Sequence, residues 1–484
     1  MRNWLLTLGV LLAMLQCATQ ARCEIYSLDE AREMYKAGKY AEAAPTFAHE
    51  LKRKSNNGSL NHWYGVCLYE TGRSEEAVPY LIKGASRRVK LSNYYLGKAY
   101  LSLYKFDDAI NAFTAYFDIL EDDDKEPTDE NNRLLSSAKL GKRMLRGVEQ
   151  VQIIDSISVD SLSFINHYKL SQEAGRLVGC DDLPKDLQVD SSMVAFMPQR
   201  GDMIYTAIKS QSGNYDLQQS GRLLGGEWST LQSMSEALNN DDNQRFPYLL
   251  NDGQTLYFAQ DGESSLGGLD IYVTMFNSER GDYMLPQNIG MPFNSLYNDY
   301  MMAIDETTGV GWFVTDRNHI PGQLTIYLFI PNANKKVYAD IDEDSLRNLA
   351  MLTSIADTWQ EGSDYTDLLA AVNAIKTDAA NFKQPEFFFV LCNGIVYTNS
   401  SDFKNDVALK YFNQARSAQR KLDDKQAALS DLRKRYVAAT QSDKAVITEQ
   451  ILTLEEELLN VTEQPVVYEN RARNAELSFI NANN

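Results

Sequence analysis

A repeated pattern of small and large apolar residues places the strongest constraint on how the first third of this chain can fold. A small residue recurs at intervals of 34 and 32 positions, and a large apolar residue follows each one four positions later: Ala43, Ala77 and Ala109, followed by Phe47, Leu81 and Phe113. Residues i and i+4 lie on the same face of an α-helix. The small residue lets a neighbouring helix approach and the large one fills the groove, so the pattern predicts stacked helices from Ser27 to about Gly147.

The period and residue types of this pattern resemble the tetratricopeptide repeat, whose unit has about 34 residues. Gly65 and Gly97 each lie twelve residues before the next repeated alanine, inside the preceding helix, where close helix contact leaves no room for a side chain. We assign residues 22–147 to this domain. The resemblance implies a solenoid that performs no chemistry of its own and offers a surface to a protein partner.

Past Val148 the periodicity changes from helical to alternating. The stretches RGDMIYTAIKSQSGNYDL, DGQTLYFAQDGESSLGGLDIYV and TGVGWFVTDRNHIPGQLTIYLF each contain a turn, an aromatic strand, a polar loop and a second strand. Their equivalent positions Tyr205, Tyr257 and Phe313 recur at intervals of 52 and 56 positions. A period near 50 with four strands per unit is typical of a β-propeller blade. We expect a β-propeller of about five blades over 148–400, with a helical insertion at 342–380.

The C-terminal segment returns to helical periodicity. Residues 402–435 carry nine Lys or Arg against five Asp or Glu, whereas residues 443–463 carry one Lys against six acids. Opposite charge on adjoining helices favours their pairing, so we expect a helical hairpin or coiled coil at 401–463. It either packs within the molecule or protrudes to bind a partner. We expect Pro465 to end the helix and leave a loose tail at 464–484. The fold class is therefore multidomain, α + all-β.

The first residues have the order of a secretory signal. One arginine precedes an apolar run at 4–15 that is too short to span a bilayer, and small residues follow. We expect a signal peptide at 1–21, cleaved after Ala21, and export of the protein. Lipidation at Cys17 is the less favoured alternative, because Gln16 stands where a small residue is usual.

Four cysteines follow that cleavage site: Cys23, Cys67, Cys180 and Cys392. Their spacing matches no zinc pattern. Export permits disulfides, with Cys180–Cys392 and Cys23–Cys67 as the possible pairs, and buried free thiols are the alternative.

The aspartates of the middle region are the main candidates for chemistry: Asp252, Asp261, Asp270, Asp299 and Asp316. A calcium site would need several carboxylates at one point, and glycoside cleavage would need two facing ones. Turn formation explains the same residues without a ligand, because Asp252-Gly253 supplies the positive φ angles of a tight hairpin and Gly267-Gly268 turns the longer loop. We therefore assign no catalytic, cofactor-binding or metal-binding residue.

The four histidines form no pair at a metal-ligand spacing: His49, His62, His167 and His319. The sequence also contains no HExxH, GxSxG or GxxxxGK[ST] motif. We expect polar helix positions for His49 and His62, a turn position for His319, and no enzymatic activity. The net charge of −19 also argues against a nucleic-acid partner.

The motif DGQTLYFAQDG…GGLDIYV resembles the WD40-like repeats of TolB-type propellers. Its combination with tetratricopeptide repeats resembles a class of Bacteroidota cell-envelope proteins, as do IIDSISVDSLSFINHYKLSQEAG and FFFVLCNGIVYTNSSDF. Many such proteins end in an OmpA-like domain that we do not find here, which weakens the expectation of direct cell-wall anchoring.

The resemblance implies a non-catalytic scaffold or adaptor in the periplasm or at the periplasmic face of the outer membrane. Its partners would be envelope proteins, including outer-membrane proteins, bound through the helical repeats and the coiled coil. The complex would serve outer-membrane assembly, transport or secretion, with type IX secretion and gliding machinery among the candidates. A glycan- or peptide-binding propeller is the alternative, and a glycan-active enzyme is the less favoured one.

Overall fold

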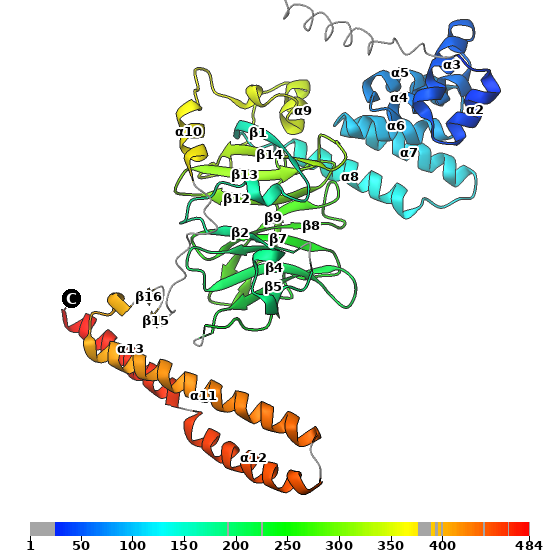
Figure 1. Cartoon of the computed structure of the whole chain (residues 1–484). Coiled ribbons are helices and arrows are strands. Elements are labelled where there is room, and N and C mark those ends of the chain that lie inside the picture. The colour runs from blue at the N-terminus through cyan, green and yellow to red at the C-terminus, as the bar shows by residue number, and fades with distance from the viewer. Residues whose placement is uncertain are drawn as a thin grey trace, which may run out of the picture.

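The computed structural model of the chain describes residues 25–190, 193–223, 226–375, 389–392, 395–397, 400–438, 441–462 and 464–483. The predicted signal peptide at 1–21, including Cys17, lies outside these ranges, and so does Cys23. Helices come first, antiparallel sheets follow and helices end the chain (Figure 1). At this level the predicted α + all-β order is confirmed.

The N-terminal part is a series of stacked helical hairpins: α2 (Leu28–Lys36), α3 (Tyr40–Arg53), α4 (Gly58–Glu70), α5 (Ser74–Ser86), α6 (Leu91–Ser102), α7 (Phe106–Asp122) and α8 (Asp129–Leu145). The repeated alanines and their large partners are fully buried. A Cβ on Gly65 would stand 2.8 Å from the Leu81 side chain, and one on Gly97 would stand 2.6 Å from the Phe113 ring. Each glycine therefore makes room for the large residue on the second helix of its own hairpin.

Each of three hairpin turns in this part contains a residue with a left-handed backbone. The first two positions are Gly38 (φ 74°) and Gly72 (φ 78°), each five residues before a repeated alanine. In the third turn the equivalent position, five residues before Ala109, is occupied by Tyr104 at φ 56°. A non-glycine residue pays a steric penalty in this region. Tyr104 is nevertheless 3% exposed, so its side chain has a packing role that glycine cannot fill.

The middle part contains three sheets of four or five antiparallel strands. The first sheet comprises β2 (Arg176–Gly179), β3 (Val194–Met197), β4 (Met203–Lys209), β5 (Tyr215–Gly221) and β6 (Gln232–Ser233). The second comprises β7 (Gln244–Leu249), β8 (Thr255–Gln260), β9 (Asp270–Asn277) and β10 (Asp282–Tyr283), with β11 (Gln287–Asn288) also paired to β9. The third comprises β12 (Asp299–Asp305), β13 (Val310–Thr315), β14 (Gln323–Ile330) and β1 (Gln152–Asp160).

The third sheet joins the two ends of the middle part. Strand β1, which opens this part of the chain, pairs with β14, which closes it, over a register from Gln152↔Ile330 to Asp160↔Gln323. The interruption between Ile153 and Asp155 marks a bulge in β1. A strand from the beginning of the chain segment therefore completes the last sheet.

The expected propeller of about five blades does not appear in the described residues, where three such sheets are present and no closed ring is formed. The reason lies after β14, where the chain forms the helices α9 (Glu343–Met351) and α10 (Thr366–Ala374) instead of further strands. The next strands, β15 (Phe389–Cys392) and β16 (Ile395–Tyr397), pair with each other and, among the described residues, join none of the three sheets.

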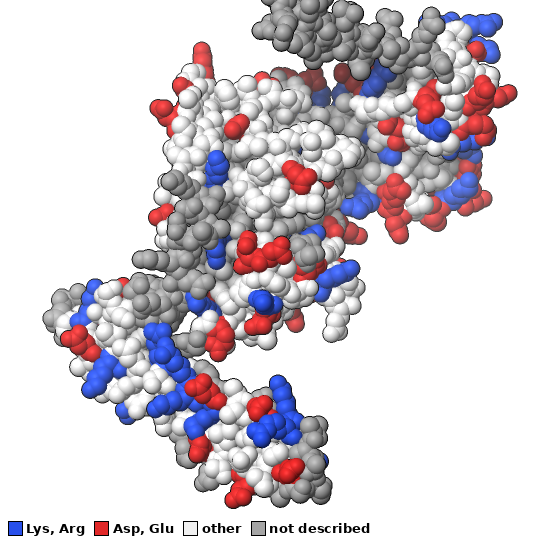
Figure 2. Space-filling view, viewed as in Figure 1, with Lys and Arg blue, Asp and Glu red and all other residues white. Residues whose placement is uncertain are grey.

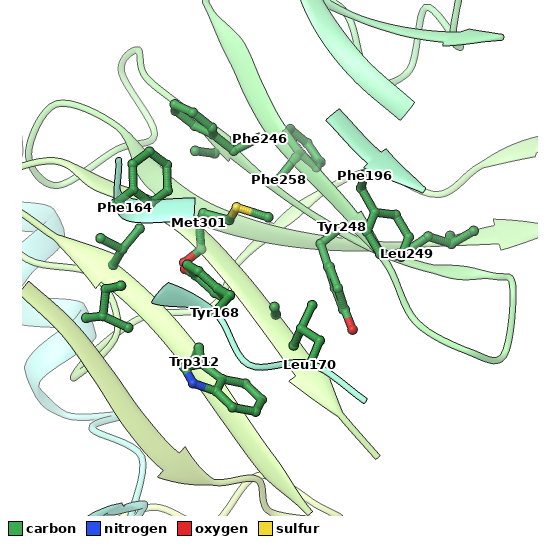
Figure 3. Packing of buried hydrophobic residues seen from close by; sticks show 14 of the residues in the cluster. Phe164, Tyr168, Leu170, Phe196, Phe246, Tyr248, Leu249, Phe258, Met301 and Trp312 are labelled. Atoms are coloured by element: carbon green, nitrogen blue, oxygen red, sulfur yellow. The ribbon is translucent and has the colours of Figure 1, made fainter. Parts of the chain in front are cut away.

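One hydrophobic core extends across all three sheets (Figure 3). The rings of Phe196 and Tyr248 are 4.5 Å apart and join the first sheet to the second. The Tyr248 hydroxyl donates to the carbonyl of Ile304 at 2.8 Å and so reaches the third. The ring centroid of Tyr168, which follows β1 in the chain, lies 6.4 Å from that of Trp312. Burying each such ring stabilises the fold by about 1.5–3 kcal/mol, which holds the sheets as one body.

The helical hairpins dock onto loops of the second and third sheets. Tyr104 packs in one buried cluster with Leu266 and Met291, and the backbone of Leu296 hydrogen-bonds to it. The Arg133 guanidinium donates to the carbonyl of Gly267 at 2.9 Å. The tyrosine that replaces a turn glycine is therefore one of the residues through which the third hairpin contacts the sheets.

The C-terminal part is built on α11 (Asp406–Ala438), a 33-residue helix against which α12 (Gln441–Val461) and α13 (Gln464–Asn483) pack one after the other (Figure 1). Ion pairs join α11 to α12, with Arg433 at 2.8 Å from Glu455 and Lys425 beside Glu457. Basic side chains gather along α11 in Figure 2, as the charge pattern predicts.

The expected loose tail at 464–484 is wrong over the described residues, because α13 occupies 464–483. Pro465 begins this helix instead of only ending the one before it, since proline is tolerated in the first helical turn, where its missing N–H would have no partner. Ala472 is fully buried with Phe389, Tyr397 and Phe412, so the β15–β16 hairpin belongs to the same small core as α11 and α13.

Candidate functional site

Two of the candidate aspartates, each at the end of a strand, hold neighbouring strands of one sheet together. Both Asp261 carboxylate oxygens accept from Asn243, at 2.8 Å from the backbone N–H and 2.8 Å from the side-chain amide. Asp316 accepts from Asn298 in the same way, at 2.7 Å and 2.7 Å. The two asparagines are separated by about one sheet repeat in the sequence, so successive sheets repeat the same clamp.

A second asparagine clamp repeats with the same spacing. Asn239 accepts from the N–H of Leu217 at 2.8 Å and donates to its carbonyl at 3.0 Å. Asn294 bonds Ile271 identically, at 2.7 Å and 2.9 Å. These contacts satisfy the backbone where one sheet passes to the next, and they show that the sheets are related structural units.

Asp252 has the turn role expected of it. Its carboxylate accepts from the N–H groups of Gln254 and Thr255, both at 2.8 Å, and from the Thr255 hydroxyl at 2.6 Å. Gly253 beside it has φ 67°. This arrangement closes the β7–β8 hairpin and leaves the carboxylate committed to the turn.

Asp270 and Asp299 are two of the candidate aspartates, close enough for the charge of one to act on the other, and both are completely buried. Asp270 accepts from Leu266 N at 2.8 Å and Asn288 Nδ2 at 2.7 Å. Asp299 is 3.0 Å from the Arg317 guanidinium. Burial, and next the charge of Asp299, raise the pKa of Asp270 to about 7. Burial likewise raises the pKa of Asp299, against the attraction of Arg317. With no exposed surface, this pair supports the loops and does not face a substrate.

The glycines in the same loop have a tighter role than a simple turn. A Cβ on Gly267 would stand 2.1 Å from the Tyr297 carbonyl oxygen, and one on Gly268 would stand 2.0 Å from Asn298 Oδ1. A larger residue at 267 would require backbone to move, and one at 268 would displace the Asn298 side chain. The GG pair therefore allows the loop of the second sheet to approach the loop before β12.

The histidines are separated in the structure. His49 and His167 are exposed, and His319 occupies a left-handed turn at φ 52°. His62 is buried, with its Nδ1 3.0 Å from the Ser92 hydroxyl and its Nε2 3.5 Å from the Tyr35 hydroxyl. Over the described part of the chain, no three His, Cys, Asp or Glu side chains converge as a metal ion would require.

Cys67 and Cys180 are free thiols in the structure, in line with the free-thiol alternative. Cys23 and the side chain of Cys392, which the two possible disulfides would need, lie outside the described residues. Burial raises the pKa of the Cys67 thiol to about 12 and makes it unreactive.

The feature best suited to contact another molecule is a row of half-buried tyrosines that crosses the helical hairpins. Its members, which we call the tyrosine row, are Tyr35, Tyr40, Tyr69, Tyr94, Tyr95 and Tyr116. Ring centroids of neighbours in the row are 5.6 Å apart for Tyr35–Tyr40, 6.1 Å for Tyr69–Tyr95 and 5.4 Å for Tyr94–Tyr95. His62 bridges the two halves, with its ring 5.9 Å from that of Tyr95.

Lys98 lies in the middle of the tyrosine row. Its ammonium group is 5.2 Å from the ring centre of Tyr69 and 5.4 Å from those of Tyr94 and Tyr95. Three aromatic faces attract the cation without neutralising it. Among the described residues Lys98 makes no ion pair with a carboxylate. It therefore presents a positive charge framed by aromatic rings.

The electrostatic surroundings of the row keep its phenols protonated. Burial, and then the charge of Glu70, raise the pKa of Tyr95 to about 12. Burial raises the pKa of Tyr69 and of Tyr94 as well, and the Tyr94 hydroxyl donates to Glu130 at 3.1 Å. The row offers hydroxyl donors, ring faces and one cation, which suits binding and not catalysis.

Sequence reasoning missed the tyrosine row, although one signal for it is visible. Tyr35 and Tyr69 are separated by the same interval as Ala43 and Ala77, so they share the period of the repeated alanines. Tyr94 and Lys98 lie at i and i+4 on α6 and so share one helix face, but the approach of Tyr69 to Lys98 depends on how α4 and α6 pack.

No protein-family model matches the chain, and no curated protein aligns with it significantly. Across the described ranges, none of the helices has both the length and the apolar character needed to cross a bilayer.

Proposed function

We propose that this chain is a non-catalytic scaffold or adaptor of the cell envelope that binds a protein partner through the tyrosine row. The observation that carries the proposal is the ammonium group of Lys98, framed by Tyr69, Tyr94 and Tyr95 on a surface formed by successive hairpins. Aromatic rings supply large contact area with few rotatable bonds, and they are enriched in protein interfaces. The unpaired cation favours a partner segment that carries a carboxylate.

The same proposal gives the other parts supporting roles. The hairpins would act as a tetratricopeptide-type solenoid, and the three sheets as an open array of WD40-like blades, which their repeated asparagine clamps support. The α11–α12 hairpin would supply a second partner surface. From the sequence resemblance, the setting would be the periplasmic side of the outer membrane, within an assembly, transport or secretion complex of the type IX secretion or gliding kind.

The proposal is tested by crosslinking the tagged native protein in its cells and identifying what it captures by mass spectrometry. We expect a reproducible set of envelope proteins, crosslinked near residues 35–98. Lys98→Gln should reduce capture by roughly tenfold, because it removes a charge-assisted contact worth about 1.4 kcal/mol or more.

Lys139→Gln is the matched control, since Lys139 is an exposed lysine on α8 outside the tyrosine row. Equal loss of capture in both variants would point to non-specific attraction. Recovery of the protein alone, under conditions that capture other envelope complexes, would refute the scaffold proposal.

A further inference from the structure

A second candidate site lies where helix α8 faces the second sheet. The cleft there has a volume of about 640 Å³, within the range of roughly 300–1,000 Å³ usual for small-ligand sites, which often form between structural units. We call this cleft the α8 cleft. Its lining comes from α8, from the second sheet and from loops. Leu140, Arg143 and Met144 of α8 form one wall, while Gln260, Tyr272 and Asn288 of the sheet line it from another side.

The remaining lining residues complete a surface with distinct apolar and polar parts. Leu285 and Pro286 contribute apolar surface, and Asn240, Glu263 and Lys335 contribute polar groups. A ligand in the α8 cleft would therefore meet carbon surface and hydrogen-bonding groups together.

Two cations line the cleft in a chain whose net charge is −19. Arg143 has no ion pair within the described residues, and the Lys335 ammonium donates to the Ile289 carbonyl at 2.8 Å without a carboxylate partner. Glu263 is the one carboxylate among the lining residues. The excess of positive charge favours a ligand with an anionic group.

A buried acceptor without a donor lies next to the lining residues. Gln244 is completely buried, and its Oε1 has no hydrogen-bond donor among the described residues. Its Nε2 donates to Asn240 Oδ1 at 2.6 Å, and it pairs across the strands with Gln260. Both neighbours line the α8 cleft. The unpaired Gln244 acceptor therefore lies beside two residues that line the α8 cleft.

We propose that the α8 cleft binds an acidic saccharide, that is, a sugar ring that carries a carboxylate. The carboxylate would pair with Arg143 and Lys335, the hydroxyls would meet the amides of Asn240 and Gln260, and the carbon face of the ring would lie against the apolar wall. This site is separate from the tyrosine row and does not depend on the protein partner proposed above. It also does not require the central mouth of a closed propeller.

The test is isothermal titration calorimetry on the full chain with three probes: a uronic-acid trisaccharide, its neutral counterpart and an acidic tripeptide. We expect the acidic saccharide to bind and the neutral one to bind at least roughly tenfold more weakly. Arg143→Gln and Lys335→Gln should each weaken binding by about tenfold, and the affinity should fall as salt rises.

Arg146→Gln and Lys336→Gln are the matched controls, because these exposed residues are close neighbours in the chain and do not line the cleft. They should change the affinity by less than about twofold, and equal melting temperatures would show that all four variants fold. No binding of the acidic saccharide at about 10 mM would overturn the proposal. Preference for the tripeptide, or equal effects in lining and control variants, would overturn it too.

Discussion

At the scale of single residues, the polar groups buried in this protein serve the fold, and two of them carry a consequence for its pH dependence. His62 and Asp270 are each buried and hydrogen-bonded, yet burial lowers the pKa of His62 and raises the pKa of Asp270. Burial disfavours the charged form in both cases. A histidine therefore resists protonation, and a carboxylic acid resists ionisation.

Burial lowers the pKa of His62 from 6.5 to about 4. The unfolded chain then takes up a proton between pH 6.5 and 4 that the folded chain refuses, so stability falls as the pH falls through this window, by up to about 3 kcal/mol. His62→Gln should remove most of this slope. Hydrogen exchange of the α4 amides at pH 5 and pH 7, corrected for intrinsic rates, measures it. A slope that is the same in both proteins would refute the assignment.

Burial raises the pKa of Asp270 from 3.8 to about 7, and the opposite sign follows. The folded chain holds a proton that the unfolded chain releases, so the contribution of Asp270 to stability is fully present below pH 3.8 and is lost as the pH rises to about 7. Asp270→Asn should flatten this decline in the stability of the second sheet. Hydrogen exchange of the amides at residues 255–277 measures the decline. Asp252→Asn is the control, because Asp252 lies in an exposed turn. A steeper decline in Asp270→Asn would contradict the prediction.

At the scale of elements, the most consequential contact is made by the last helix. Glu476 on α13 is completely buried and accepts from the Tyr397 hydroxyl at 2.9 Å and from the N–H groups of Lys404 at 2.6 Å and Asn405 at 3.1 Å. The two backbone donors, Lys404 and Asn405, lie immediately before α11 begins at Asp406, where the helix dipole favours a negative charge. One carboxylate from α13 thus joins the β15–β16 hairpin to α11.

We therefore expect deletion of residues 464–484 to unfold the start of α11, whereas removal of a loose tail would change nothing. Glu476→Gln should destabilise the C-terminal part by about 1–3 kcal/mol, because it leaves buried donors with a weaker acceptor. Glu449→Gln is the control, since Glu449 is exposed on α12. Hydrogen exchange of α11 distinguishes the cases. Unchanged protection after the deletion would show that α13 is dispensable.

At the scale of the whole molecule, the helical hairpins and the sheets are held together at Tyr104. This residue occupies a left-handed turn position and lies close enough to Arg317 and Asp299 for their charges to act on its phenol. The strain at φ 56° costs about 1 kcal/mol, and burial of the ring in the junction offsets it. Tyr104 therefore stabilises the docking of the hairpins on the sheets at the expense of an unstrained turn between α6 and α7.

Tyr104→Gly should relieve the turn and empty the junction, for a net loss of roughly 2–4 kcal/mol in docking. Thermal unfolding, followed by differential scanning calorimetry, should then separate into two transitions for the hairpins and the sheets. Tyr104→Phe keeps the ring and should leave one transition close to that of the parent. If Tyr104→Gly melts as the parent does, the junction does not depend on this ring.

The sequence alone supports the order of the parts because that order depends on local periodicity. The regular spacing of the repeated alanines predicts hairpins, and alternation past Val148 predicts strands. The hairpin role of Asp252 follows equally from its own neighbours, as does the opposite charge of α11 and α12. Each of these inferences depends on the pattern of residues along the chain and does not require knowing which distant segments meet in space.

Only the tertiary structure decided the features that join distant segments. The pairing of β1 with β14, the three sheets in place of about five blades, and the docking of α13 on α11 depend on contacts between segments far apart in the chain. The tyrosine row around Lys98 and the α8 cleft arise in the same way. Periodicity determines which face of an element is buried, but the partner of that face is selected by packing over the whole molecule, which no local pattern encodes.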